Sequence, residues 1–202
     1  MSPKREDAAE KILDAAESLF LSHGYSGTSM RDIARAAGYR SVAGLYNHFT
    51  DKETLFEALL IARSPYDEIF EILQNIPTDH AANYLPQLFE TLAVFMQDHI
   101  NFLQLVLLDF LEFDAAHMQA LITDRSQQIM PIVARLGGLP GLRADIPPLI
   151  LIRLVAIQLF GYTLTQNILP AAILDAHPPQ EWRAHVQNLL MRGLIEEDND
   201  HA

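Results

Sequence analysis

Between Thr28 and Lys52, apolar residues recur in two short runs with the spacing of a helix. Both runs follow i, i+3, i+4, i+7, the first as Met30, Ile33, Ala34 and Ala37 and the second as Val42, Leu45, Tyr46 and Phe49. Thr28 or Ser29 can cap the first helix, and Ser41 can cap the second. Gly38 stands where a helix often ends in a left-handed residue. This pattern predicts a helix-turn-helix, which places its second helix in the major groove of DNA.

Helical periodicity dominates the rest of the chain, with no strand-like alternation. A first helix is expected from about Lys4 to Ser22, and Thr50 with Glu53 predicts a capping box at the start of a fourth. Proline, glycine and aspartate breakers then separate further helical runs at about 67–75, 80–97, 99–112, 115–136, 146–168 and 179–195. We therefore predict an all-α fold with nine to ten helices.

The N-terminal segment also resembles the DNA-binding domain of the TetR family of bacterial transcriptional regulators. The matching parts, about the first quarter of the chain, are Ile12 to Gly38, Leu45 to Phe49 and Asp51 to Phe56. The resemblance implies a helix-turn-helix domain at 1–50 and a ligand-binding and dimerisation domain at 51–195. The composition of residues 196–202 predicts a disordered acidic tail. The turn between Gly38 and Ser41 is one residue longer than the family usually has, which bears on the tilt of the recognition helix.

Two sets of residues are predicted to contact DNA. In the phosphate set, Tyr46, His48 and Lys52 resemble the family's phosphate-contacting positions, and Thr28 and Arg31, at the start of the preceding helix, can contact the backbone similarly. The alternative is that these are ordinary polar surface residues, with Tyr46 partly in the core. Lys52 lies near a helix start, where free N–H groups favour an anion. The base-reading set is Arg40, Ser41, Val42, Ala43, Gly44 and Asn47. Small residues let the backbone approach base edges, Arg40 can reach guanine, and Asn47 can pair with adenine. The alternatives are that Arg40 binds phosphate and that Asn47 faces solvent.

The middle helices carry many aromatic residues, which at helical spacing are commonly plain core. The resemblance implies a small-molecule pocket there instead, with candidates Phe70, Tyr84, Phe89, Phe95, Phe102, Phe110, Phe113 and Met118. The helices between Thr50 and Leu136 are rich in apolar residues and contain few lysine or arginine side chains. We therefore expect a largely apolar ligand that is neutral or cationic.

The run 146–168 is apolar around most of its circumference, whereas a surface helix of a monomer needs only one apolar stripe. We predict that it pairs with the run 179–195 and with their symmetry mates in a four-helix bundle, an arrangement that the resemblance also implies. The expected interface residues are Leu154, Ile157, Phe160, Trp182, Val186 and Leu190. Such a homodimer suits a pseudo-palindromic double-stranded operator.

The net charge of −12 is carried entirely by residues 51–202, because residues 1–50 hold six basic and six acidic side chains. The absence of cysteine excludes disulfides and thiolate sites, and the N-terminus lacks the apolar core of a signal peptide. We therefore expect a cytoplasmic protein. A membrane span at 146–174 is disfavoured by Arg153, since arginine at a bilayer centre costs about 2.5–3.5 kcal/mol.

Catalytic and metal chemistry find little support. Glu112, Asp114 and His117 have metal-ligand chemistry, but an acidic residue near a helix start is commonly a cap. No glycine-rich phosphate loop or nucleophile elbow occurs. We expect no enzyme activity, no cofactor and no metal. The predicted function is a ligand-responsive transcriptional regulator, by family habit a repressor. The alternatives are a DNA-binding activator or architectural protein without a ligand, and a small helical enzyme or binding protein.

Overall fold

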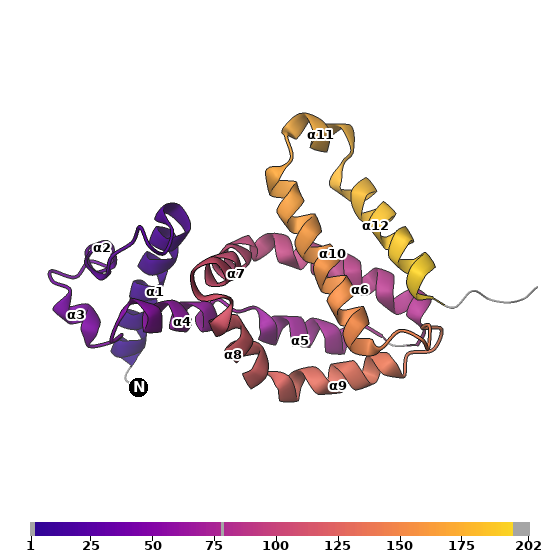
Figure 1. Cartoon of the computed structure of the whole chain (residues 1–202), viewed down its shortest axis with the longest axis horizontal. Helices are drawn as coiled ribbons and strands as arrows, with labels where there is room; N and C mark the ends of the chain where they lie inside the picture. Colours follow the sequence, from indigo (N-terminus) through magenta and orange to yellow (C-terminus); the bar gives the residue numbers. More distant parts are fainter. Residues whose placement is uncertain (1–2, 78, 196–202) are drawn as a thin grey trace, which may run out of the picture. The chain divides into compact units, whose positions relative to one another are not determined.

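The computed structural model describes residues 3–77 and 79–195, which form twelve α-helices (Figure 1). They are α1 (Pro3–His23), α2 (Met30–Ala36), α3 (Ala43–Tyr46), α4 (Lys52–Ala62), α5 (Tyr66–Asn75), α6 (Ala81–Asp98), α7 (Ile100–Phe113), α8 (Ala116–Asp124), α9 (Ser126–Gly137), α10 (Pro148–Ile168), α11 (Ala171–Ala176) and α12 (Pro179–Leu194). The all-α prediction is confirmed. The predicted acidic tail lies outside the described residues.

The predicted number of nine to ten helices is too low, for two local reasons. The run expected at 115–136 is divided at Arg125, whose φ of −83° and ψ of 4° leave the helical range. Just before it, the Thr123 hydroxyl donates to the Gln119 carbonyl oxygen at 2.7 Å, a bond that bends helices. The additional helix α11 begins directly after Pro170, whose φ of −58° suits a helix start.

The helix caps are partly those expected from the sequence. Ser29 caps α2 in a capping box with Asp32, and Gly38 has a left-handed φ of +81°. Helix α3 begins one residue later than Ser41 would allow, with Val42 at the N-cap and no side-chain cap. The α4 cap is Asp51, not the predicted Thr50. The Asp51 carboxylate accepts from the Thr54 amide at 2.7 Å and also complements the helix dipole.

The chain forms two compact units. The first contains the chain up to Pro65 together with Asn101–Asp124, and the second contains Tyr66–Ile100 together with the chain from Arg125 onward. Helices α4, α7 and α8 therefore pack in the same unit as the helix-turn-helix. Packing does not define a functional boundary, so the division predicted at residue 50 stays a prediction.

Each of helices α1 to α4 contributes one face to the core of the first unit, and α7 and α8 contribute further buried residues. The fully buried members from α1 to α4 include Ile12, Ala16, Phe20, Ile33, Leu45, Leu55, Phe56 and Leu59. Burying such an aliphatic or aromatic side chain contributes about 1.5–3 kcal/mol. Helix α3 has only four residues and so depends on Leu45 and the adjacent Phe49 to hold it against this core.

In the second unit, α6 packs against α10 and α12, and α10 also packs against α9. The central residues are Tyr84, Leu85, Phe89, Leu151, Val155 and Leu159. Arg135 of α9 stabilises the end of α5 by donating to the carbonyl oxygens of Leu73 at 2.9 Å and Ile76 at 2.7 Å. The Leu73 carbonyl is among the four that the end of α5 leaves unsatisfied, and Ile76 lies directly after that end.

Helix α10 is, by length and composition, apolar enough to cross a membrane. Its buried residues, Leu151, Val155, Leu159, Tyr162 and Thr163, follow one helical stripe. A core helix of a water-soluble protein meets the same criteria, so this finding does not decide between the two environments.

Candidate nucleic-acid interface

The turn and helix α3 present an exposed polar surface. Arg40, Ser41, Ala43, Tyr46 and Asn47 are exposed, whereas Leu45 and Phe49 are buried behind them. The amides of Gly38 and Tyr39 donate to the carbonyl oxygens of Arg35 and Ala34, at 3.1 and 2.8 Å, and so fix the turn. The predicted base-reading residues are thus brought together over one short segment, with Val42 and Gly44 half-buried.

Tyr39, which lies in the lengthened turn, packs against the recognition helix. A Cβ added to Gly44 would lie 2.5 Å from Tyr39 Cδ1, so glycine leaves the space that the ring occupies. The Tyr39 hydroxyl lies 3.4 Å from His48 Nε2, and the two rings are 6.3 Å apart. Sequence reasoning missed Tyr39 and gave Gly44 a role only in the approach to bases. The one available signal was the additional residue in the turn.

Lys52 ties the start of α4 to the loop between α1 and α2. Its Nζ donates to the carbonyl oxygens of Tyr25 at 2.8 Å and Thr28 at 2.9 Å, and lies 4.0 Å from the centroid of the Tyr25 ring. An ammonium group has three donors, so one remains for a phosphate oxygen. The predicted phosphate contact stays a prediction, and the structure adds a second role for the same side chain.

The other predicted phosphate residues differ in exposure. Arg31 and Tyr46 are exposed and His48 is half-buried. Thr28 is only 3% exposed, and its hydroxyl donates to the carbonyl oxygens of Leu19 and Gly24. The predicted role of Thr28 would therefore require a contact from its backbone or a rearrangement of its side chain.

An aromatic cluster lies behind the Lys52 site. The Tyr25 ring contacts Phe20, Phe56 and Phe113, with centroids 4.8–5.5 Å away. Burial raises the pKa of the Tyr25 phenol, and the neighbouring carboxylates of Glu53, Asp51 and Glu112 raise it further. Tyr25 therefore stays neutral at physiological pH. Through Phe113, the cluster brings the end of α7 against the loop that Lys52 holds.

A buried carboxylate joins α7 to α8 beside this cluster. Asp109 is fully buried, and its two oxygens accept from His117 Nδ1 at 2.7 Å and from the Met118 amide at 2.9 Å. His117 Nε2 lies 3.8 Å from a carboxylate oxygen of Glu53 in α4. The only sequence signal for this site was an aspartate within the otherwise apolar stretch of α7.

The possible metal set of Glu112, Asp114 and His117 is not brought together. Glu112 instead accepts from the Ser26 hydroxyl at 3.0 Å, and Asp114 lies in the turn before α8 with a φ of 51°. Over residues 3–77 and 79–195, no group of three or more side chains is placed to hold a metal ion.

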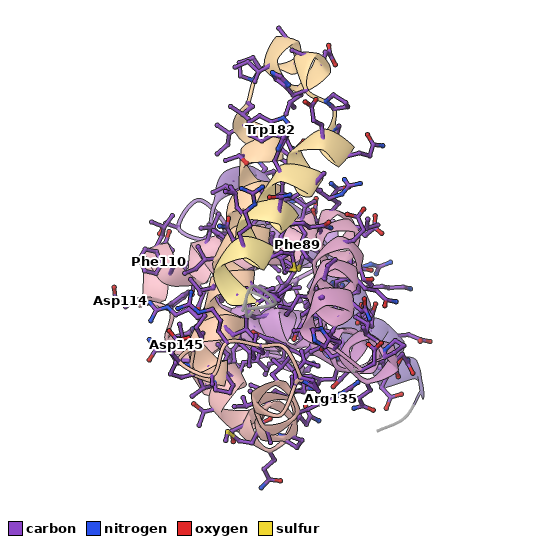
Figure 2. The ribbon with its side chains drawn as sticks, turned by 90° about the vertical axis from the view of Figure 1, so that its right-hand side faces the viewer. Phe89, Phe110, Asp114, Arg135, Asp145 and Trp182 are labelled. Carbon is purple, nitrogen blue, oxygen red and sulfur yellow. The ribbon has the colours of Figure 1, made fainter. Side chains whose placement is uncertain are left out.

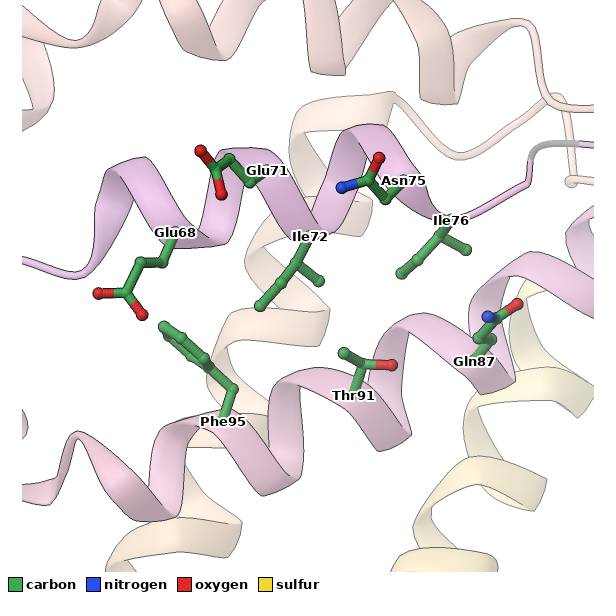
Figure 3. Close-up of a pocket in the computed structure, with 8 residues that line it drawn as sticks. All are labelled: Glu68, Glu71, Ile72, Asn75, Ile76, Gln87, Thr91 and Phe95. Atoms are coloured by element: carbon green, nitrogen blue, oxygen red, sulfur yellow. The ribbon is translucent and has the colours of Figure 1, made fainter.

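The predicted ligand-pocket residues divide between the two units. Phe70, Tyr84, Phe89 and Phe95 belong to the second unit, and Phe102, Phe110, Phe113 and Met118 to the first. Tyr84 and Phe89 are core residues with 1% exposure, whereas Phe110 is 62% exposed. Of the eight, Phe95 lines a pocket of about 460 Å³ between α5 and α6 (Figure 3). The predicted contact with a ligand stays a prediction for all eight residues.

Helices α10 and α12 expose large apolar side chains. Ile157 is 57% exposed, Leu154 39% and Trp182, near the start of α12, 36% (Figure 2). Phe160 and Val186 are half-buried. Leu190 instead packs into the core with 9% exposure, while its neighbour Leu189 is 71% exposed. The second unit therefore has an uncovered apolar surface on the two helices predicted to form a dimer.

Comparison with known proteins finds matches to the N-terminal part of the chain. A family model described as bacterial regulatory proteins, tetR family, matches residues 12–59. The chain is 39% identical over 56 residues to the HTH-type transcriptional repressor AcnR of Corynebacterium glutamicum, which is 28% of this chain and 29% of that protein. It is 48% identical over 51 residues to the HTH-type transcriptional repressor ComR of Escherichia coli, 25% of this chain and 24% of that protein. These matches span less than a third of either relative.

Solved structures agree with the fold over nearly the whole chain. A TetR family transcription regulator from Marinobacter aquaeolei has a TM-score of 0.71 at 20% identity, covering 97% of this chain and 100% of that one. NalD of Pseudomonas aeruginosa, described as the secondary repressor of the MexAB-OprM multidrug efflux pump, has a TM-score of 0.65 at 24% identity, covering 95% and 98%. At these identities the likeness establishes the fold alone.

Proposed function

Because this chain carries the TetR-family regulatory domain at residues 12–59 and has the fold of TetR-family regulators, we propose that it is a DNA-binding transcriptional regulator. It binds its operator as a homodimer, in the cytoplasm, and a small molecule releases it. The observation that carries the proposal is the exposed surface of α3 backed by Leu45 and Phe49, within the segment that matches the family. That arrangement exposes polar residues of the turn and helix on the side where they can meet base edges.

Repression is the favoured direction of control. The relatives AcnR and ComR are both described as transcriptional repressors. Their similarity to this chain covers the DNA-binding segment.

The homodimer is supported by the exposed apolar residues of α10 and α12. Leaving Ile157, Leu154 and Leu189 in water is unfavourable, at about 25 cal/mol for each Å² of apolar surface. A second copy of the same surface would cover them and would set two recognition helices about a two-fold axis. A regulator of that symmetry reads a pseudo-palindromic site.

The test is selection of binding sites from random double-stranded DNA with the purified full chain at a fixed salt concentration. The proposal predicts enrichment of an inverted repeat whose half-sites lie one helical turn or more apart. The double variant R40A/N47A serves as the matched control and should lose the enrichment while remaining folded by circular dichroism. Failure to enrich any sequence, or an enriched site without two-fold symmetry, would contradict the proposal.

A further inference from the structure

A pocket that is open to solvent lies between α5 and α6 and is large enough for a small molecule. Its volume of about 460 Å³ lies within the range of about 300–1,000 Å³ that is usual for ligand pockets. All of its lining residues belong to the second compact unit, so the pocket is formed within that unit. Figure 3 shows the two helices facing one another along its length.

The lining combines an apolar surface with hydrogen-bonding groups. Ile72 and Ile76 of α5 supply the aliphatic part, and Ile76 is only 4% exposed. Asn75, Gln87 and Thr91 supply side-chain amides and a hydroxyl. Five of the eight lining residues are polar or charged and three are apolar, so the lining suits a molecule with a polar group on an apolar body.

The charge of the lining has one sign. Glu68 and Glu71, three residues apart on α5, both line the pocket, and its eight lining residues include no lysine or arginine. In the part of the chain that the structure describes, no ion pair to Glu71 is found. Glu68 is contacted by His99, whose Nε2 lies 3.8 Å from its carboxylate. An anionic ligand would meet two like charges here, whereas a cation would meet two opposite ones.

An aromatic ring lies at the same end of the pocket as Glu68. The side chains of Glu68 and Phe95 point toward one another across the gap (Figure 3). His99 stacks on Phe95 with a centroid distance of 4.0 Å and so helps to fix the ring. A ring next to a carboxylate is favourable for an ammonium group, since the ring face and the carboxylate both attract a cation.

We propose that this pocket binds an organic cation, an amine or quaternary ammonium group carried on an apolar body. The cationic group lies between Glu68 and the Phe95 ring, with Glu71 as the second carboxylate that lines the pocket, and the apolar body lies along Ile72 and Ile76. The inference deepens the proposed function, on which it rests, by naming the chemical class of the effector.

The test uses three probes with one carbon skeleton and different charges: 4-phenylbutylamine, 4-phenylbutanol and 4-phenylbutyrate. Each is titrated calorimetrically into the full chain, without DNA, at low salt. The amine should bind most tightly and the carboxylate most weakly. E68Q and E71Q should each weaken the amine about two- to fivefold, the range of one exposed charge pair, and leave the alcohol unchanged.

Two further variants locate the site. E181Q removes an exposed carboxylate from α12, outside the pocket, and should leave amine binding unchanged. T91W should fill the pocket and abolish binding, with circular dichroism confirming that the chain is folded. The proposal would be overturned if the amine and the alcohol bound with equal affinity. It would also be overturned if E68Q and E71Q did not weaken amine binding, or if T91W still bound the amine.

The result can be separated from that of the DNA selection. An enriched operator with no amine binding would overturn the effector class and leave the DNA-binding function standing. Amine binding that depends on Glu68 but has no effect on operator retention would uphold the pocket and contradict release by a ligand.

Discussion

The fully buried carboxylate of Asp109 and the His117 ring are joined by a hydrogen bond of 2.7 Å between Oδ1 and Nδ1. The second carboxylate oxygen accepts from the Met118 amide, so Asp109 also caps the start of α8. One side chain therefore satisfies two donors that would otherwise be buried without a partner.

Asp109→Ala should consequently lower the free energy of unfolding by about 1–3 kcal/mol, the cost of leaving buried donors unsatisfied. Urea denaturation followed by circular dichroism measures it. Trp182, the one tryptophan of the chain, lies in the other compact unit, so its fluorescence is the less suitable probe. Asp124→Asn, at the exposed end of α8, should change stability by no more than about 0.5 kcal/mol. Equal effects of the two variants would contradict the role of Asp109.

Lys52→Ala should weaken operator binding without changing the preferred sequence. If the third Nζ donor contacts a phosphate, the slope of log K against log salt should flatten by about 0.9. Arg192→Ala, on α12, serves as the control and should leave the slope unchanged. A lower affinity with an unchanged slope, together with reduced thermal stability, would mean that Lys52 acts only by holding the carbonyls of Tyr25 and Thr28.

Arg40→Ala and Asn47→Ala should each relax specificity at one or two base pairs by about 1–3 kcal/mol, because both side chains are exposed beside α3 and can reach base edges. Site selection with each variant measures the change. If both variants return the parental consensus, these residues contact the backbone or solvent and the assignment to bases is wrong.

Gly44→Ala should weaken operator binding, because the added methyl group would meet the Tyr39 ring at 2.5 Å. Overpacking of this kind costs about 1–3 kcal/mol. In a Tyr39→Ala background the same substitution should cost much less, so a double-mutant cycle isolates the contact. Gly193→Ala is the matched control: it also lies in a helix, but nothing lies within 4 Å of its added Cβ. Additive effects of Gly44→Ala and Tyr39→Ala would show that the two residues do not interact.

Ile157→Glu should convert a dimer into monomers that lose tight operator binding. Burial of this residue at an interface exceeding about 1,000 Å² would place the new charge against apolar surface. Sedimentation velocity at micromolar concentration measures the change, with Leu111→Glu on α7, 74% exposed, as the control. Ile157 is a better probe than Leu190, whose charged variant would disturb the core. A parent chain that sediments as a monomer would contradict the interface.

Periodicity was sufficient to predict the all-α class and most helices, because one apolar face per helix is what the folded core requires. Of the two apolar runs, Ile33, Leu45 and Phe49 are buried as their spacing predicts, whereas Tyr46 of the second run is 50% exposed. The sequence did not distinguish between neighbouring residues that can both cap the same helix. Thr50 and Asp51 can both cap a helix, and the structure uses Asp51. Such a choice depends on the backbone conformation, which the sequence does not display.

Contacts between distant segments were beyond prediction from the sequence. Lys52 was recognised as important by its position, but its bonds to the Tyr25 and Thr28 carbonyl oxygens join residues more than twenty positions apart. The pairing of Asp109 with His117 required the turn at Asp114, which takes a left-handed φ without glycine. The base-reading segment was different, because its residues are contiguous and one local motif brings them together.

The chain passes from the first compact unit into the second and back again, which limits where it can be cut into fragments that fold. The unit that contains the helix-turn-helix is discontinuous in sequence, since Asn101–Asp124 returns to it after Tyr66–Ile100 has entered the other. A fragment ending near Pro65 would keep the DNA-reading helices but lose Phe113, Asp109 and His117, and would expose the faces of Tyr25 and Phe56 that they cover. The helix-turn-helix therefore cannot be transferred as a single continuous segment. A chimaeric protein that takes it from this chain must also include Asn101–Asp124, or contain helices that replace α7 and α8 in packing against Tyr25 and Phe56.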